Sequence, residues 1–182
     1  WWAHFIAPDD RGLADAPLLR REFILDRDAE LVVSAKMRVT ALGIFEAHLN
    51  GAPVSDDVLS PGWSAFEWNL RYREIDVTTL IEREDVIGVA LGNGWYRGRL
   101  GWVGGRAYYG DELAALVQLE IEFADGHHQR VGTDDSWTAG PSDTVANDLY
   151  DGQTIDARLR DDGWLRPHFV DDTWSGVHLV AV

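Results

Sequence analysis

The sequence contains no cysteine, which excludes disulfide bonds, zinc–thiolate sites and cysteine nucleophiles. It has a single methionine, and no apolar run approaches the ~20 residues that a membrane-spanning helix requires. No charged and then apolar leader opens the chain, and Trp1-Trp2-Ala3 resembles the middle of a longer protein. We therefore expect no membrane partner, and the sequence leaves open whether the protein is cytoplasmic or secreted.

Basic residues are scarce as well. The 16 Lys and Arg residues face 31 Asp and Glu residues, and the net charge is -15. A charge of this sign argues against nucleic acid or an anionic membrane surface as a partner. A neutral or cationic ligand, or calcium, remains compatible with it, and so does an acidic surface that serves solubility alone.

Long amphipathic helices are also missing, and short alternating segments take their place. The segment from Leu31 to Thr40 alternates, with Val33, Ala35, Met37 and Val39 expected on the buried face. Gly43 to Leu49 alternates too and ends in Asn50-Gly51, the strongest short hairpin signal. With 46% hydrophobic residues, 182 residues suffice for one packed domain. These patterns predict an all-β fold, an antiparallel β-sandwich with jelly-roll wiring like that of galactose-binding domains.

Three parts of the chain lack strand periodicity. Residues 1–20 are expected to be a leading segment from a preceding domain, draped over the surface, and residues 21–182 the sandwich itself. Gly98 to Gly110 contains five glycines and is expected to be a long loop. Asn147 to Gly152 is expected to be a polar loop rich in side-chain oxygens.

The chain turns sharply after a buried strand at Val86 to Leu91. Gly92, Asn93 and Gly94 tolerate positive φ, and Trp95, Tyr96 and Arg97 follow at once. Aromatic rings with polar tips, next to exposed backbone groups, can receive a sugar, which has an apolar face and a hydroxyl rim. The alternative is that the two rings close the end of the sandwich without any ligand.

A polar cluster further along the chain is a candidate cation site. Asn147, Asp148 and Asp151 supply hard oxygens, and Asn93 joins them if the two loops share one end of the sandwich. A Ca²⁺ ion at this position would bind vicinal sugar hydroxyls. The alternative is a hydrogen-bonded turn without an ion.

The sequence gives little support for a catalytic carboxylate pair, a histidine metal site or a phosphate-binding loop. Among 31 acidic residues, sequence alone cannot select a catalytic carboxylate pair. His127-His128 lacks metal-ligand spacing and is expected in a solvated turn. Gly92-Asn93-Gly94 is not a phosphate-binding loop, because no G-x-x-x-x-G-K pattern is present and no helix is expected after it.

Five ordered motifs support a family resemblance. They are H-L-N-G-A-P-V, L-S-P-G-W-S-A-F, Y-R-E-I-D-V-T-T-L-I, V-A-L-G-N-G-W-Y-R-G and N-D-L-Y-D-G-Q-T-I-D-A-R, between His48 and Arg158. In order and spacing they resemble the N-terminal β-sandwich domain of bacterial α-L-rhamnosidases, glycoside hydrolase family 78. The resemblance covers the chain from about Trp2 to Trp174.

This resemblance implies an accessory domain. In that family, inverting hydrolysis of terminal α-L-rhamnose belongs to a separate (α/α)6 barrel, so no catalytic residue is expected in this chain. The family includes a rhamnose-binding module that uses calcium and an Asp-Asn pair, whose nearest match here is Gly92-Asn93. We therefore expect Asn93, Trp95, Tyr96, Arg97, Asn147 and Asp148 to hold L-rhamnose or a related sugar, with possible calcium ligands at Asn93, Asn147, Asp148 and Asp151. The alternative role is a structural domain that packs against the barrel and shapes the rim of its active site, with Tyr150 to Arg158 as interface.

Overall fold

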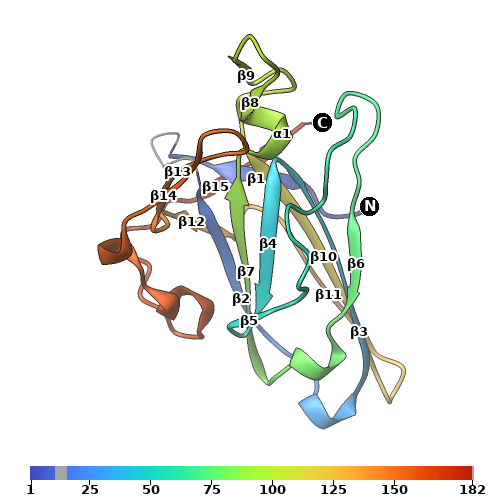
Figure 1. The fold of residues 1–182 in the computed structure, drawn as a ribbon. Helices are drawn as coiled ribbons and strands as arrows, with labels where there is room; N and C mark the ends of the chain where they lie inside the picture. Colours follow the sequence, from blue (N-terminus) through green and yellow to red (C-terminus); the bar gives the residue numbers. More distant parts are fainter. Residues whose placement is uncertain (11–15, 182) are drawn as a thin grey trace.

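The protein is a sandwich of two antiparallel sheets (Figure 1), as the sequence predicted. A computed structural model describes residues 1–10 and 16–181. One sheet has six strands, in the order β15-β1-β10-β3-β6, with β11 also paired to β10. The bounds are β15 (Val177–Val180), β1 (Phe5–Pro8), β10 (Ala114–Phe123), β3 (Val32–Leu42), β6 (Arg73–Asp76) and β11 (His128–Gly132).

The second sheet has five strands in the order β12-β2-β7-β4-β5. Their bounds are β12 (Thr138–Gly140), β2 (Leu18–Ile24), β7 (Glu84–Gly92), β4 (Ile44–Leu49) and β5 (Ala52–Pro53). Two small hairpins stand outside both sheets, namely β8 (Arg99–Leu100) with β9 (Gly105–Arg106), and β13 (Thr144–Asp148) with β14 (Gly152–Ile155). The helices are short: α1 (Gly94–Arg97) and the 3₁₀ turns η1 (Ala29–Leu31), η2 (Thr78–Leu80), η3 (Ala157–Leu159) and η4 (Asp162–Leu165). No helix among the described residues has the length and apolar character to cross a membrane.

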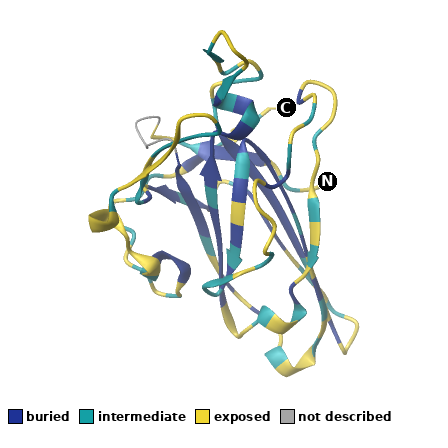
Figure 2. Cartoon of the chain, in the orientation of Figure 1, coloured by how far each residue is buried: buried dark blue, intermediate teal, exposed yellow. Residues whose placement is uncertain are grey.

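The hydrophobic core lies between the two sheets, where buried residues of both meet (Figure 2). The predicted alternation in β3 is confirmed for Ala35, Met37 and Val39, which are all buried. Val33 is exposed instead. Val32 pairs with Phe123 and Ser34 with Glu122, so Val33 is the extra residue of a β-bulge, which turns its side chain to the other face.

The predicted hairpin at Asn50-Gly51 is also confirmed. Both residues have positive φ, 54° and 84°, the conformation that a tight hairpin turn requires. The Asn50 side chain fixes the turn, because its Oδ1 accepts a hydrogen bond from the Val86 amide at 2.8 Å. As expected from Pro53, β5 is an edge strand.

The structure departs from the sequence expectations in four segments. Residues 5–8 form strand β1 inside the six-stranded sheet, where a surface segment was expected. Residues 98–110 and 147–152 contain or close short hairpins where open loops were expected. A one-turn helix, α1, begins at Gly94, where no helix was expected.

Candidate functional site

The predicted corner begins where β7 ends. Gly94 has φ of +50°, and a Cβ atom there would lie 2.5 Å from Cγ2 of Ile44, so the position requires glycine. The turn leads directly into α1, and this helix carries Trp95 and Tyr96. Since neighbouring residues on a helix point about 100° apart, the two rings cannot face the same way.

The two predicted sugar-binding rings therefore have different environments. Tyr96 is buried and packs on Phe66, with 5.2 Å between ring centroids. Burial raises the pKa of the Tyr96 hydroxyl, and the nearby carboxylates of Asp111 and Glu112 raise it further. Trp95 is half-buried and stacks in parallel on Trp63, at 6.3 Å between centroids. Tyr96 has no open face for a sugar, and Trp95 is partly covered.

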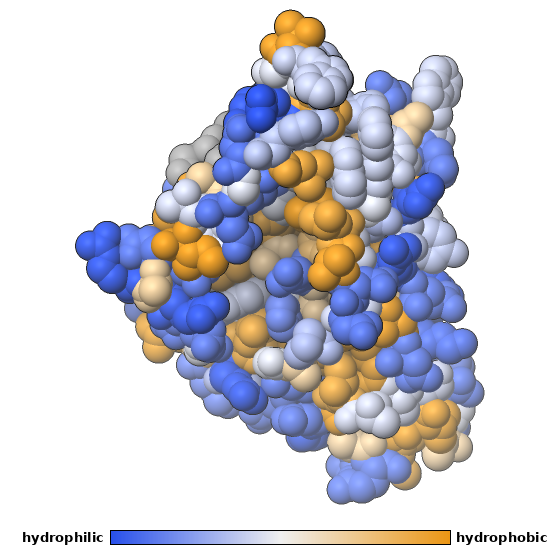
Figure 3. All heavy atoms as spheres, in the orientation of Figure 1, coloured by the Kyte–Doolittle hydropathy of each residue, from blue (hydrophilic) through white to orange (hydrophobic). Residues whose placement is uncertain are grey.

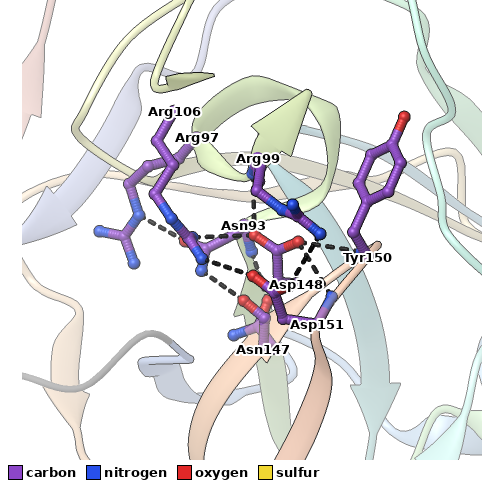
Figure 4. Close-up of polar contacts among 8 residues, drawn as sticks. All are labelled: Asn93, Arg97, Arg99, Arg106, Asn147, Asp148, Tyr150 and Asp151. Carbon is purple, nitrogen blue, oxygen red and sulfur yellow. Dashed lines mark hydrogen bonds and ion pairs between the residues drawn. The ribbon is translucent and has the colours of Figure 1, made fainter. Parts of the chain in front are cut away.

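Asn93 and Asn147 do come together at one end of the sandwich (Figure 4). Asn93 is 2% exposed. Its backbone N–H donates to Oδ1 of Asn147 and its Nδ2 donates to the Asn147 carbonyl, both at 2.7 Å. Its Oδ1 accepts from Nε of Arg97. The polar atoms of Asn93 thus fasten α1 to β13.

Asp148 and Asp151 lie beside this pair and accept hydrogen bonds from cationic and amide donors. Oδ2 of Asp148 accepts from the Arg99 amide and from Nη1 of Arg106, both at 2.8 Å. Asp151 pairs with the guanidinium groups of Arg99 and Arg106, each at 2.9 Å. Burial alone would raise the pKa of Asp148, but the amides of Arg99, Tyr150 and Asp151 and the charge of Arg106 together hold it below the ordinary value.

In this arrangement the predicted calcium ligands already accept hydrogen bonds or pair with arginines. The predicted ligand oxygens point at guanidinium and amide N–H groups, so an ion would have to displace arginines from both Asp148 and Asp151. Within residues 1–10 and 16–181, no group of three or more His, Cys, Asp or Glu side chains is placed to hold a metal. Calcium binding by this chain stays a prediction.

A larger concave surface than this corner lies elsewhere, on the outer face of the five-stranded sheet. Residues 141–174, here called the C-terminal arm, lie beside this face, and a groove of about 690 Å³ runs between them. Its floor is a small apolar cluster made by β2, β7 and η4. The cluster consists of Leu18, Trp164 and Leu165, with Ala90, Phe169 and Trp174 packed against it.

Buried Arg20 holds the arm in place. Its Nε donates to the Trp164 carbonyl at 2.9 Å, and its Nη2 donates to the Arg166 carbonyl at 3.1 Å. Its guanidinium also pairs with Asp171 at 3.3 Å and lies over the Phe169 ring. Because the cation bonds to backbone at two points, it determines the path of the arm and hence the width of the groove.

Exposed apolar side chains line both sides of the groove (Figure 3). Val58 and Leu59 stand on one side, and Ile155, Leu159 and Val170 on the arm, and all are exposed. Polar groups lie among them. They include Glu46, His48, Asn147, Asp161 and Thr173. A groove with apolar walls and dispersed carboxylate, amide and hydroxyl groups suits a neutral ligand with one apolar side and several hydroxyls.

Of the predicted site residues, only Asn147 lines this groove. Sequence reasoning missed Trp164, Phe169 and Trp174, because the arm shows no period from which a buried face could be inferred. The presence of three aromatic rings within residues 164–174 was the available signal. Arg99 and Arg106 were missed because they lie in the glycine-rich stretch that was expected to be a loop.

Comparison with known proteins identifies close similarities. Residues 30–182 match the family model described as "Alpha-L-rhamnosidase N-terminal domain". The α-L-rhamnosidase of Streptomyces avermitilis is 39% identical over 160 residues, which are 87% of this chain and 15% of that protein. The crystal structure of the native Aspergillus terreus α-L-rhamnosidase superimposes with a TM-score of 0.93 at 35% identity, over 99% of this chain and 21% of that one. The crystal structure of the Streptomyces avermitilis enzyme complexed with L-rhamnose gives a TM-score of 0.87 at 37% identity, over 92% of this chain and 16% of that one. The chain thus spans between 15% and 21% of the length of these relatives.

Proposed function

Because the chain belongs to the family of α-L-rhamnosidase N-terminal domains, we propose that it is an accessory domain that binds terminal L-rhamnose, or a related sugar, without hydrolysing it. The groove between the five-stranded sheet and the C-terminal arm is the binding site in this proposal. Hydrolysis is assigned to parts of the enzyme outside these residues, since the chain spans only 15% of the Streptomyces relative. One similar structure was solved with L-rhamnose bound to that enzyme.

The groove supports the proposal through its size and chemistry. Its volume of about 690 Å³ lies within the usual range of small-molecule sites, ~300–1,000 Å³. L-Rhamnose carries a methyl group at C6 and hydroxyls around the rest of its ring. The methyl group matches apolar side chains such as Leu159 and Val170, and the hydroxyls match Asn147 and Asp161. A neutral sugar also avoids repulsion by the charge of -15.

Titration calorimetry with L-rhamnose tests the proposal. For a monosaccharide in an open groove we expect a Kd on the order of 1 mM, about -4 kcal/mol. Leu159→Asp and Val170→Asp introduce charge on the apolar wall at exposed positions, where they leave the fold intact. We expect the double variant to lose the binding heat.

The matched control is Ile24→Asp, an exposed position paired with Glu84 at the opposite end of β7 from Gly92. It should bind L-rhamnose like the unaltered chain. Absence of saturable heat with the unaltered chain at tens of millimolar sugar would contradict the proposal. Equal binding by the double variant would remove the groove as the site.

A further inference from the structure

Several large apolar side chains are exposed to solvent at one end of the molecule. Trp102 and Val103 are fully exposed at the turn between β8 and β9, Trp68 is 90% exposed, and Trp63 is about half exposed. We call these four residues the crest. Tryptophan is costly to leave in water, and contiguous apolar patches on a protein surface usually mark an interaction site.

The two segments that carry the crest are joined through α1. Trp63 stacks on Trp95 of α1, and its Nε1 donates to the Tyr109 hydroxyl at 3.2 Å. The Ala107 amide donates to the carbonyl of Arg97, the last residue of α1, at 3.0 Å and so ties the end of the β8–β9 hairpin to the same helix. Trp63 and the hairpin are therefore both supported by α1, and the hairpin projects beyond the sheets (Figure 1).

Ion pairs with the β13–β14 segment also hold the β8–β9 hairpin in place. Arg99 and Arg106, one on each of its strands, pair with Asp151, and Arg106 also pairs with Asp148 (Figure 4). The Arg99 guanidinium lies over the Tyr150 ring, 5.1 Å from its centroid. These contacts fix the position of the hairpin, and Trp102 and Val103 at its turn are exposed to solvent. Such a preorganised projection loses little conformational entropy when a partner covers it.

We propose that the crest packs against the remainder of an α-L-rhamnosidase polypeptide, the part that lies outside these 182 residues. This inference depends on family membership and not on sugar binding in the groove. The relatives are about five to seven times longer than the matched region, so most of their surface belongs to other parts.

Two other occupants fit less well. A second copy of the chain would bring another charge of -15 against the first. A sugar prefers a concave site, whereas the crest projects from the surface. An uncharged, apolar surface of the same polypeptide meets neither objection.

Hydrogen exchange on the complete polypeptide encoded by the gene tests the proposal. The amides of residues 99–106 should exchange at least tenfold more slowly there than in the isolated 182-residue chain. The double variant Trp68→Ser, Trp102→Ser should abolish this protection in the complete polypeptide. Because both side chains face solvent, the same changes should leave the Tm of the isolated chain unaltered. Ile24→Ser, 60% exposed at the opposite end of the sandwich, should retain the protection.

Equal exchange at residues 99–106 in the complete polypeptide and in the isolated chain would overturn the proposal. A crest-dependent dimer of the isolated chain would assign the surface to a second copy, and would also overturn it. So would a reading frame that encodes no further domain. L-Rhamnose binding in the groove could persist under all three outcomes, so the two proposals fail separately.

Discussion

Asp148 is the residue on which the corner of the molecule depends most. Its side chain is 4% exposed and accepts hydrogen bonds from the Arg99 amide, the Tyr150 amide and the Arg106 guanidinium. Through these bonds it connects the β13–β14 hairpin to the β8–β9 hairpin. A buried carboxylate with several donors loses much of that stabilisation when its charge is removed.

Asp148→Asn should lower the free energy of unfolding by about 1–3 kcal/mol, because the amide is a weaker acceptor and carries no charge for Arg106. Urea unfolding at neutral pH measures the change. Asp162→Asn, at an exposed position of the arm, should change it by less than about 0.5 kcal/mol. An Asp148 variant as stable as the unaltered chain would show that the network contributes nothing.

The difference in unfolding free energy between the Asp148→Asn variant and the unaltered chain should depend on pH. The pKa of Asp148 in the folded protein lies below its ordinary value of 3.8, so the folded state favours the charged form. The stabilisation is therefore fully present above the unfolded pKa and is lost as the pH falls through the folded one. Unfolding curves of both proteins should converge below pH 3.8 and stay separated by a constant amount above about pH 5. A difference that persists unchanged into strong acid would assign the effect to side-chain shape and not to charge.

Sequence reasoning at this scale predicted one contact, between Asn93 and Asn147, and left the roles of these residues open. Asn93 and Asn147 were expected to meet if two loops shared one end of the sandwich, and they do. Whether an amide faces a ligand or another side chain depends on tertiary contacts that no local pattern contains. Arg99 and Arg106 illustrate the point, since they occupy the oxygens that a calcium ion was expected to take.

At the scale of elements, the contact between β7 and the arm determines the groove. Ile87, Val89 and Leu91 face the core, and the alternate position Gly88 lies under η4. A Cβ atom on Gly88 would lie 2.3 Å from Cδ2 of Leu165 and 2.5 Å from Cζ3 of Trp164. Only glycine lets η4 approach the strand this closely.

Gly88→Ala should therefore push η4 away from the sheet and change the shape of the groove. We expect a loss of about 1–3 kcal/mol in the free energy of unfolding, typical of overpacking. Binding of L-rhamnose should weaken several-fold in calorimetric titration. Unchanged binding in a destabilised variant would show that the arm is not part of the site.

Ile87→Val provides the matched control on the same strand. It removes one methylene from the core side, at a cost of about 0.5–1.5 kcal/mol, and leaves the arm untouched. Similar destabilisation without loss of sugar binding would separate groove geometry from general stability.

The strands that sequence predicted well are those with one buried and one exposed face. β3 and β4 alternate over six or more residues, and the set predicted to be buried in β3 is buried apart from Val33 at the bulge. β1 escaped prediction because its four residues are too few to show a period, and its partners Ala115 and Val180 are far away in sequence. The β8–β9 hairpin was missed because its glycine-rich segment carries few side chains to form a pattern, and the β13–β14 hairpin because its strands of five and four residues are too short to show a period.

At the scale of the whole molecule, the carboxylates of Asp148 and Asp151 can be paired with arginines or with a calcium ion. The two alternatives predict different thermal stabilities. If the arginines keep the carboxylate oxygens, the Tm should be the same in excess chelator and in millimolar calcium. A bound ion at 100 times its Kd would add about 2.7 kcal/mol, which raises the Tm of a domain of this size by roughly 5–10 °C. Differential scanning calorimetry with and without chelator distinguishes them, and magnesium serves as the control for non-specific ionic effects. A calcium-specific rise of several degrees would support the predicted calcium site.

Nitrogen-labelled NMR with L-rhamnose tests the central claim, that the groove binds sugar, most directly. Stepwise addition should shift the amides of Gly92, Asn147, Leu159 and Val170 and the indole signals of Trp164 and Trp174, along one saturable curve. L-Mannose, which differs from L-rhamnose only by a hydroxymethyl group in place of the methyl group, should produce smaller shifts. Absence of saturable shifts, or shifts confined to Trp95 and the crest, would contradict the account.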